Sequence, residues 1–338
     1  MMLLAPFGTT SMVNVLANDD YLPGANTSLM AVGGTYVGAA LFDPLTGVLS
    51  YVPANTEPGT IVTLIYQVCN LDTIPNVCSN ATVTITVPES CVEISTKVLL
   101  EGPYNSFSGL MSTTLNNLRY LPGQDPVTFF GQETPAGQPY NVAPWNHNGT
   151  EGDGFDYNLT GTPNAGYPTN TTDWVLVSLR TGVNSNTTVC TKAALVFSNG
   201  TVQIPSGFDC CDININETYY VVIEHRNHLI VMSHVKVPIV NGVISYDFTN
   251  QDSYKTLLGF GQKNVGGKWV MYAGNGQQVN SSSADTDINV NDKDLWLNQN
   301  GQNSSYFLND LDLNGDVNVQ DKNVWLLNNG KFSDVPRN

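Results

Sequence analysis

The stretch "TIVTLIYQVCNLDTIPNVCSNATVTITV", residues 60–87, decides the fold of the chain around it. Two runs rich in Val, Ile and Thr flank the turn "NLDTIPN", and such runs are typical of β-strands that pair as a hairpin. Cys69 and Cys78 stand at the two ends of this turn. Their positions predict a disulfide between neighbouring strands of the hairpin.

Similar runs precede the hairpin: "SMVNVLAND" (11–19), "GTYVGAALF" (34–42) and "GVLSYVPA" (47–54). Turns containing Gly, Pro and Asn separate them, which predicts an antiparallel β-sandwich over residues 13–91. The order of "VNVLANDD", "FDPLTGVLSYVPA" and the hairpin resembles the Ig/cadherin-like repeats of large surface proteins from Bacteroidetes-type bacteria. In such repeats another strand comes before "VNVLAND", and here residues 1–12 stand in its place.

Residues 92–272 contain less regular strand candidates, among them "DWVLVSLRTG" (173–182) and "ETYYVVIEHRNHLIVMS" (217–233). They predict a second β-sandwich, interrupted by a polar insertion at 123–172 that is too long for a simple loop. These phrases resemble a β-sandwich module found near the C-termini of secreted Bacteroidetes proteins, for which no activity is agreed.

Residues 273–338 hold an internal duplication, because "DINVNDKDLWLNQNG" (287–301) is repeated as "DVNVQDKNVWLLNNG" (316–330). Each copy predicts an acidic loop and then a short helix. The helix is expected to begin near the last Asp of the loop, at its positive dipole end, and to end at the glycine.

The second copy follows the spacing of a twelve-residue calcium loop, in which oxygen ligands stand at positions 1, 3, 5, 7, 9 and 12. In "DLDLNGDVNVQD" the predicted ligands are Asp310, Asp312, Asn314, the carbonyl of Asp316, Asn318 and Asp321. Gly315 falls at position 6, where the backbone turns sharply, and Val317 is expected to pack between the paired loops. The first copy predicts a weaker site, with candidate ligands Asp285, Asp287, Asn289 and Asp292.

An Asp at position 12, where an EF-hand has Glu, resembles the dockerin-type calcium repeat, and this resemblance implies Ca²⁺ as the bound ion. Dockerins are docking modules for cohesin domains. A metal-stabilised clip that packs on its own β-domain is an equal alternative here. The expected fold class is thus all-β, with tandem Ig-like antiparallel β-sandwiches and a small C-terminal dockerin-like loop–helix module.

Six cysteines in a β-rich chain favour an oxidising, extracellular compartment. Beyond the hairpin pair, Cys190 is expected to bond to Cys210 or Cys211, and the partner of Cys91 is left open. Reduced buried thiols are the alternative. Sequons mark surface positions that a host cell can glycosylate. They begin at Asn26, Asn80, Asn148, Asn158, Asn170, Asn186, Asn199, Asn216, Asn280 and Asn303.

Several function classes are excluded or disfavoured by the sequence. The net charge of −16 would repel nucleic acid and anionic membranes, and no apolar run is long enough for a membrane helix. His228 and His234 are expected on one face of a strand and His225 on the other, so that all three cannot bind one metal without a bulge. Asp153 and Asp156 lie among glycines and are interpreted as turn formers or a loop cation site rather than as a glycosidase pair. With no nucleophile or phosphate-binding motif, we expect no enzyme.

The leading segment "MMLLAPF" is apolar on both faces of a strand, so it needs burial. Its side chains Met2, Leu3, Leu4, Ala5 and Phe7 can complete their own sandwich or that of a neighbouring subunit. Donation to a neighbour would build a helical homopolymer, and donor-strand pilus subunits resemble this pattern. We therefore expect an extracellular bacterial fibril or pilus-like subunit. The alternative is a monomeric adhesin or carbohydrate-binding module whose partners are glycans, with an exposed aromatic platform in the insertion.

Overall fold

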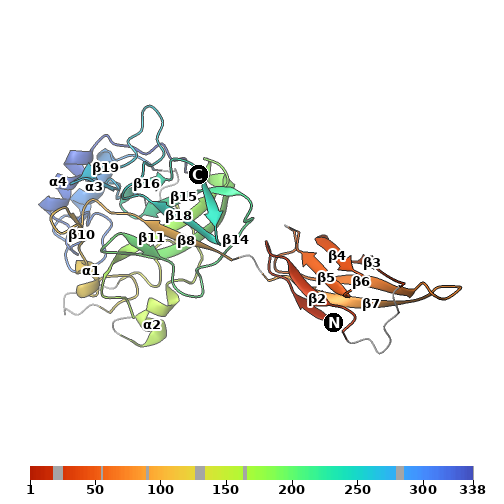
Figure 1. Cartoon of the computed structure of the whole chain (residues 1–338). Coiled ribbons are helices and arrows are strands. Elements are labelled where there is room, and N and C mark those ends of the chain that lie inside the picture. The colour runs from red at the N-terminus through yellow and green to blue at the C-terminus, as the bar shows by residue number, and fades with distance from the viewer. Residues whose placement is uncertain are drawn as a thin grey trace. The chain divides into compact units, whose positions relative to one another are not determined.

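A computed structural model describes residues 1–17, 26–54, 56–88, 91–125, 134–162, 166–278 and 285–337. The chain is mostly β, with 38% strand and 11% helix. It divides into two compact units (Figure 1). Unit 1 is Met1–Cys91 with Asp212–Asn214, and unit 2 is Val92–Cys211 with Ile215–Asn338.

Unit 1 consists of two sheets around one hydrophobic core. The strands β1-β7-β6-β3 form the first sheet and β2-β5-β4 the second. Leu49, Tyr51, Leu64 and Ile85 are fully buried in the shared core. The strand bounds are β1 Met2–Leu4, β2 Ser11–Asn14, β3 Thr27–Gly34, β4 Ala39–Asp43, β5 Val48–Val52, β6 Ile61–Asn70 and β7 Val77–Thr86.

The leading segment lies in its own unit. β1 pairs in parallel with β7 at the edge of the first sheet, with Leu3 opposite Ile85. Leu3 and Ala5 are buried in the core, whereas Met2 and Leu4 are 85% and 63% exposed. The sequence leaves two positions open for this segment, its own sandwich or that of a neighbouring subunit. In this single chain it lies in its own sandwich.

Unit 2 is built on a sheet that closes on itself. Its order is β11-β12-β13-β8-β18-β17-β15-β16, and an additional β11–β15 pairing closes the sheet into a barrel. The second region therefore differs from the two-sheet sandwich expected, because β11 is paired along both edges. All ten residues of β11 are buried, since side chains cover it on both faces.

The barrel strands are β8 Cys91–Lys97, β11 Thr171–Arg180, β12 Thr188–Phe197, β13 Thr201–Gln203, β15 Thr218–His225, β16 His228–Met232, β17 Val237–Val240 and β18 Val243–Asp247. Shorter strands are β9 Tyr104–Asn105, β10 Leu110–Met111, β14 Cys211–Asp212, β19 Lys263–Val265 and β20 Lys268–Val270. The helices are α1 Thr114–Asn117, η1 Asp153–Phe155, α2 Tyr157–Thr160, η2 Ser185–Thr187, α3 Val290–Gln299 and α4 Val319–Asn328.

The described part of the insertion packs inward. The Phe155 ring contacts those of Tyr167 and Trp174, with the latter two buried. Asp156 caps α2 by accepting a hydrogen bond from the backbone of Asn158 at 2.8 Å, as its interpretation as a turn former requires. Residues 126–133 and 163–165 of the insertion lie outside the described residues.

The six cysteines form three disulfides. Cys69 bonds to Cys78, its partner across the β6–β7 ladder, and Cys190 bonds to Cys211. Both predicted pairings are confirmed, and Cys91 and Cys210 are also disulfide-bonded. Such bonds persist in oxidising compartments rather than in the cytosol. None of the helices among the described residues has the length and apolar character needed to cross a membrane.

Candidate metal centre

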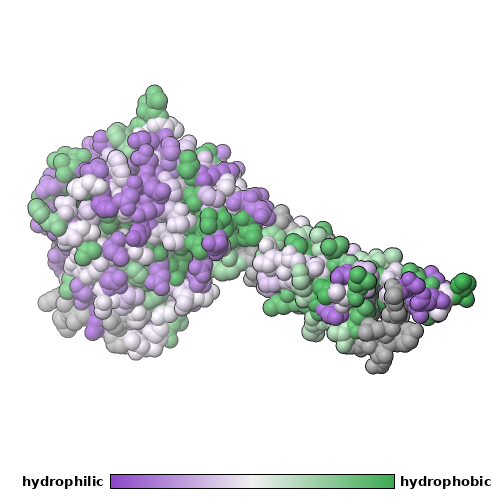
Figure 2. All heavy atoms as spheres, viewed as in Figure 1, coloured by the Kyte–Doolittle hydropathy of each residue, from purple (hydrophilic) through white to green (hydrophobic). Residues whose placement is uncertain are grey.

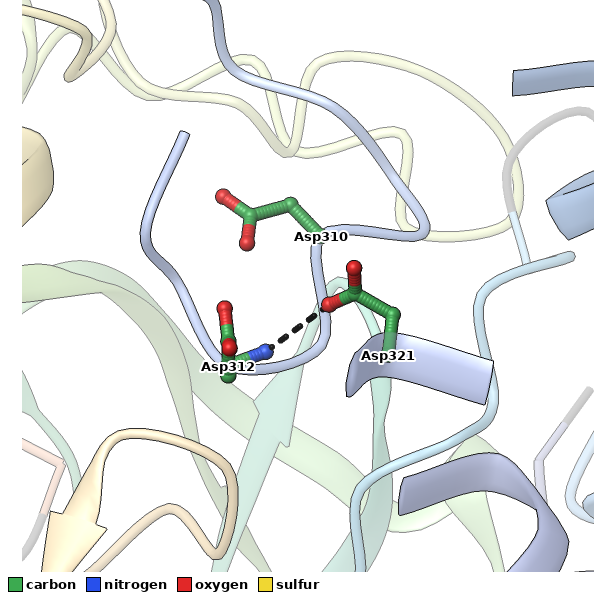
Figure 3. A group of neighbouring side chains, drawn as sticks. All are labelled: Asp310, Asp312 and Asp321. Carbon is green, nitrogen blue, oxygen red and sulfur yellow. Dashed lines mark hydrogen bonds between the residues drawn. The ribbon is translucent and has the colours of Figure 1, made fainter. Parts of the chain in front are cut away.

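Three carboxylates converge in the loop before α4 (Figure 3). Oxygens of Asp310, Asp312 and Asp321 all lie within 4.8 Å of one another. Asp310 and Asp321 are fully buried, and Asp312 is half-buried. Loop positions 1, 3 and 12 of the sequence thus come together in one cluster. Among the described residues, this cluster is the group of His, Cys, Asp or Glu side chains whose ligand atoms lie close enough to hold one metal ion.

Backbone donors hold two of these side chains in place. Asp310 accepts from the backbone nitrogens of Asn314 at 2.9 Å and Gly315 at 2.8 Å. Asp321 accepts from Leu311 at 2.7 Å and from Asn318 at 2.8 Å, at the first turn of α4. These bonds hold the two carboxylates in place within the loop.

Gly315 is required at its position for two reasons. Its φ is 92°, a conformation that residues with a side chain rarely adopt. A Cβ there would also lie 2.6 Å from the ring of Tyr120. The sharp turn at position 6 therefore lets the loop close against a residue far away in the sequence.

The electrostatics of the cluster favour a cation. Burial raises the pKa of Asp310 well above its usual value, and the neighbouring acids raise it further. Burial likewise raises the pKa of Asp312, and that of Asp321 to about 6. Crowded carboxylates that resist ionisation in the absence of a counterion are stabilised by a bound cation.

The donor set indicates what kind of cation fits. Oδ1 of Asp312 is buried and has no hydrogen-bond partner among the described residues. An ion at the cluster would satisfy this orphaned acceptor. All the candidate ligands are oxygens, which hard cations prefer over the softer transition metals. The cluster can therefore hold a metal ion of the calcium and magnesium class.

The other three predicted ligands of this loop are placed as follows. Asn314 donates from Nδ2 to Asp312 at 3.0 Å, so it adjoins the cluster. The side chain of Asp316 accepts from the backbone of Ser304 at 3.2 Å. Oδ1 of Asn318 accepts from the backbone of Gln320 at 2.7 Å and thus caps α4. Val317, expected between the paired loops, is fully buried in one cluster with Trp296 of α3 and Phe307.

The first copy repeats the helix start but not the acidic cluster among the described residues. Asn289 and Asp292 form the same capping box at the start of α3. Burial raises the pKa of Asp292 to about 7. Asp285 and Asp287 stand next to this box, where Asp285 accepts from the backbone of Asp287. Residues 279–284, which include loop positions 1 and 3, lie outside the described residues.

The metal loop is tied to the barrel by the turn between β15 and β16. Asn227 donates from Nδ2 to the carbonyl oxygen of Asp310 at 2.8 Å and to that of Leu308 at 3.0 Å. Arg226 donates to the carbonyl oxygen of Phe307. These links were not apparent from the sequence, because the partners are more than 80 residues apart.

Asp173 organises the same region from the start of β11. It accepts from Nε2 of His225 at 3.1 Å, from Nε of Arg226 at 3.2 Å and from the hydroxyl of Tyr306 at 2.6 Å. All except Tyr306 are fully buried as whole residues. Although burial opposes ionisation, Arg226 and His225 keep the pKa of Asp173 below its usual value.

The expectation that His225 and His228 lie on opposite faces is wrong. The chain reverses between them, so they face each other across the hairpin, with 2.9 Å between their Nδ1 atoms. Burial lowers the pKa of both rings, so they pack as neutral groups at neutral pH. No metal-ligand group containing these histidines occurs among the described residues.

Nine of the ten sequon asparagines are described, and all nine are exposed, as a glycan requires. They are Asn26, Asn80, Asn148, Asn158, Asn170, Asn186, Asn199, Asn216 and Asn303. Asn280 lies outside the described residues.

Comparison with known proteins identifies no family. No family model matches the chain, and no curated protein matches it. Among solved structures, an endo-fucoidan hydrolase from glycoside hydrolase family 107 matches with a TM-score of 0.21 at 13% identity, over 31% of this chain and 16% of that one. A nucleoside hydrolase-related hypothetical protein from Saccharophagus degradans, associated with carbohydrate metabolism, matches with a TM-score of 0.20 at 19% identity, over 26% of this chain and 22% of that one. The chain thus spans less than a quarter of either protein, and these likenesses are too partial to define its fold or activity.

Proposed function

We propose that the chain is a structural subunit of an extracellular bacterial filament, in which β1 of one copy replaces β1 of the next. The proposal is carried by the position of β1. It is a strand of three residues at the edge of a sheet, joined to β2 by the segment 5–10. A short edge strand joined to the next strand by a loop can be exchanged between copies.

Few contacts hold β1 in its own unit. Leu3 is its one buried side chain, and burial of a leucine contributes about 1.5–3 kcal/mol. Flanking backbone bonds join Thr84 to the carbonyl of Met1 at 2.9 Å and Ala5 to that of Thr86 at 3.0 Å. Withdrawal of β1 would uncover the edge of β7 and the core behind Leu3, and an open apolar edge readily recruits another strand.

A second copy can restore the same contacts, because its leading segment is identical. Exchange therefore costs little at equilibrium, and a head-to-tail exchange that does not close propagates as a filament. Figure 2 shows many hydrophobic residues on the visible face of unit 1. Met12, Met30 and Leu41 are among the exposed large hydrophobic residues of the unit as a whole. An exposed apolar surface of this kind is suited to contact between subunits.

The C-terminal module completes the proposal. We infer that its ion is calcium, because the twelve-residue spacing and the all-oxygen donor set suit that ion. The resemblances of residues 13–91 to Ig/cadherin-like repeats and of 273–338 to dockerins agree with a secreted surface protein. Here the module packs on its own barrel, where Trp325 and Leu311 contact Leu229 of β16. Its proposed role is to stabilise the subunit.

One pair of introduced cysteines can distinguish a β1 strand that lies in its own unit from one that has been exchanged with a neighbouring subunit. Leu4 lies opposite Thr86 in the β1–β7 ladder, and both side chains are exposed. In Leu4→Cys/Thr86→Cys, a β1 strand that remains in its own unit forms a disulfide within one chain. A strand that has been exchanged forms a disulfide between chains. We expect a ladder of multimers on non-reducing gels of concentrated protein, which collapses to one band on reduction.

A matched control uses the other neighbour of Thr86. Ile61 lies opposite Thr86 across the β6–β7 hairpin and is also exposed, so Ile61→Cys/Thr86→Cys should give monomers only. The filament proposal is wrong if Leu4→Cys/Thr86→Cys also remains monomeric at every concentration and electron microscopy of the unmodified protein shows no filaments.

A further inference from the structure

A cavity of about 200 Å³ lies against β11, within unit 2. Its floor is formed by the face of β11 that carries Leu176, Ser178 and Arg180, which alternate along the strand and so point the same way. The residues that matter for its chemistry are Trp145, Ser178, Arg180, Thr191, Glu224 and Arg337. The volume is below the roughly 300–1,000 Å³ of pockets for drug-sized ligands, so it suits a smaller molecule.

Arg180 is the feature of the cavity that calls for a ligand. Arg180 is only 3% exposed, and its Nη1 donates a hydrogen bond to the carbonyl oxygen of Pro336 at 2.8 Å. Nε is buried and has no hydrogen-bond partner among the described residues. An unsatisfied buried donor on a cation is costly, and a ligand acceptor at the Nε edge would remove that cost. This edge of a guanidinium is one that binds carboxylates in a forked geometry.

Glu224 does not neutralise Arg180 by direct contact. Its Oε2 accepts from Nε of Arg337 at 2.9 Å, from Nη2 of Arg337 at 2.5 Å and from Nε1 of Trp145 at 3.0 Å. Glu224 is thus paired with Arg337. Two guanidinium groups and one carboxylate line the cavity, which leaves one positive charge for an anion.

Trp145 supplies an apolar wall. Its indole is half-buried and is fixed by its hydrogen bond to Glu224, while the Arg337 guanidinium lies 5.6 Å from its ring centroid. The Tyr140 ring also packs against the indole, with ring centroids 5.1 Å apart, so the part of the indole that lines the cavity is held in place as an apolar contact for a sugar. The cavity is also lined by hydroxyls, with Oγ of Ser178 and Oγ1 of Thr191 3.2 Å apart and Thr188 exposed. Hydroxyl groups that can donate or accept suit the hydroxyls of a sugar.

We propose that this cavity binds a carboxylate-bearing sugar, such as one uronic acid unit of an acidic saccharide. Its carboxylate accepts from the Nε edge of Arg180, its ring packs on Trp145, and its hydroxyls bond to Ser178 and Thr191. A neutral sugar would leave the positive charge of Arg180 uncompensated. The overall charge of −16 does not prevent this, because charges farther away than about 10 Å are largely screened at physiological salt. The proposal does not depend on filament formation.

The test measures binding of D-galacturonate and D-glucuronate to the full chain by ligand-observed NMR and calorimetry. D-galactose and D-glucose are the neutral counterparts. We expect the acids to bind at least about tenfold more tightly, because only they form an ion pair with Arg180. Equal affinity for acids and neutral sugars, or no binding of either acid, overturns the proposal. Tighter binding of galactose 6-sulfate overturns the choice of carboxylate, and equal binding of acetate overturns that of a sugar.

Three variants locate the binding. Arg180→Lys keeps the charge but loses the forked edge, and should weaken galacturonate binding about tenfold or more. Thr188→Trp fills the mouth from an exposed position and should abolish binding without disturbing the buried contacts. Arg119→Lys, outside the cavity, is the matched control and should bind as the parent does. Unchanged binding by a folded Thr188→Trp protein places the sugar elsewhere and overturns the proposal.

Discussion

The indole Nε1 of Trp296 in α3 donates a hydrogen bond of 2.8 Å to the carbonyl oxygen of Asn318, the residue that begins α4. The relationship is reciprocal, since Nε1 of Trp325 donates at 2.9 Å to the carbonyl oxygen of Asn289, which begins α3. Each copy of the duplication therefore stabilises the start of the other copy's helix, and the two copies depend on each other for stability.

Removal of either indole hydrogen bond should weaken the module. We expect Trp296→Phe and Trp325→Phe each to lower the free energy of unfolding by about 0.5–1.5 kcal/mol, because the ring stays buried while one carbonyl loses its donor. Chemical denaturation followed by circular dichroism measures this. Trp269→Phe, in the separate strand β20, is the control and should change stability less. A larger loss in Trp269→Phe than in the two module variants would contradict the assignment.

Calcium should stabilise the protein through Asp310. At a calcium concentration 100 times its Kd, the expected gain is about 2.7 kcal/mol in unfolding free energy. Asp310→Asn should abolish this gain, because the variant removes a buried carboxylate of the cluster. Asp316→Asn makes the same change of charge at an exposed side chain of the same loop and should retain it. Thermal unfolding with and without calcium gives the answer, and equal behaviour of the two variants would refute the loop assignment.

The buried histidines should make unit 2 sensitive to acid. Burial lowers the pKa of His225 and His228 below 6.5, so the unfolded chain binds protons more readily than the folded one. Stability is therefore present above pH 6.5 and is lost as the pH falls towards the folded pKa, by about 1.4 kcal/mol per pH unit for each ring that remains neutral.

This pH dependence can be assigned with two substitutions. His228→Asn should flatten the slope of unfolding free energy between pH 6.5 and 5, since it removes one titrating ring. His234→Asn, at an exposed position beyond β16, should leave the slope unchanged. A slope that persists in His228→Asn at its full value would show that other groups cause the acid sensitivity.

Gly315 should tolerate no side chain. Gly315→Ala combines a φ of 92° with a contact of 2.6 Å to Tyr120, so we expect a loss of more than about 1 kcal/mol together with weaker calcium binding. Gly330→Ala has a similar φ of 84° but nothing within 4 Å of the new Cβ. The difference between the two variants isolates the effect of the close contact. Equal losses would show that backbone strain alone matters.

Sequence reasoning succeeded where the deciding contacts are local. The acid spacing of one loop predicts the cluster of Asp310, Asp312 and Asp321, and the Cys69–Cys78 pair follows from one hairpin. It failed where partners are distant. The strand β3 was missed because "TSLMAVGG" ends in two glycines, although its pairing with β6 secures it.

The histidine region shows the same limit. A strand-like run from Glu217 to Ser233 conceals a reversal at Arg226 and Asn227, which only the pairing of His225 with His228 reveals. Asp173, which binds His225, Arg226 and Tyr306, is an ordinary strand residue in the sequence. Likewise, the cavity is lined by Trp145, Arg180 and Arg337, which come from three distant segments of the chain, so no local sequence pattern predicts it.

The bonds from Asn227 to the carbonyls of Leu308 and Asp310 have a consequence for degradation in a harsh environment. If the segment that contains Leu308 and Asp310 moved away, the buried side-chain amide of Asn227 at the tip of the β15–β16 hairpin would lose its acceptors. The C-terminal module and the barrel should therefore open together. Because the proposed ion would hold this loop in place, its removal by a chelating agent should make the whole of unit 2 open to digestion by proteases, rather than its end alone.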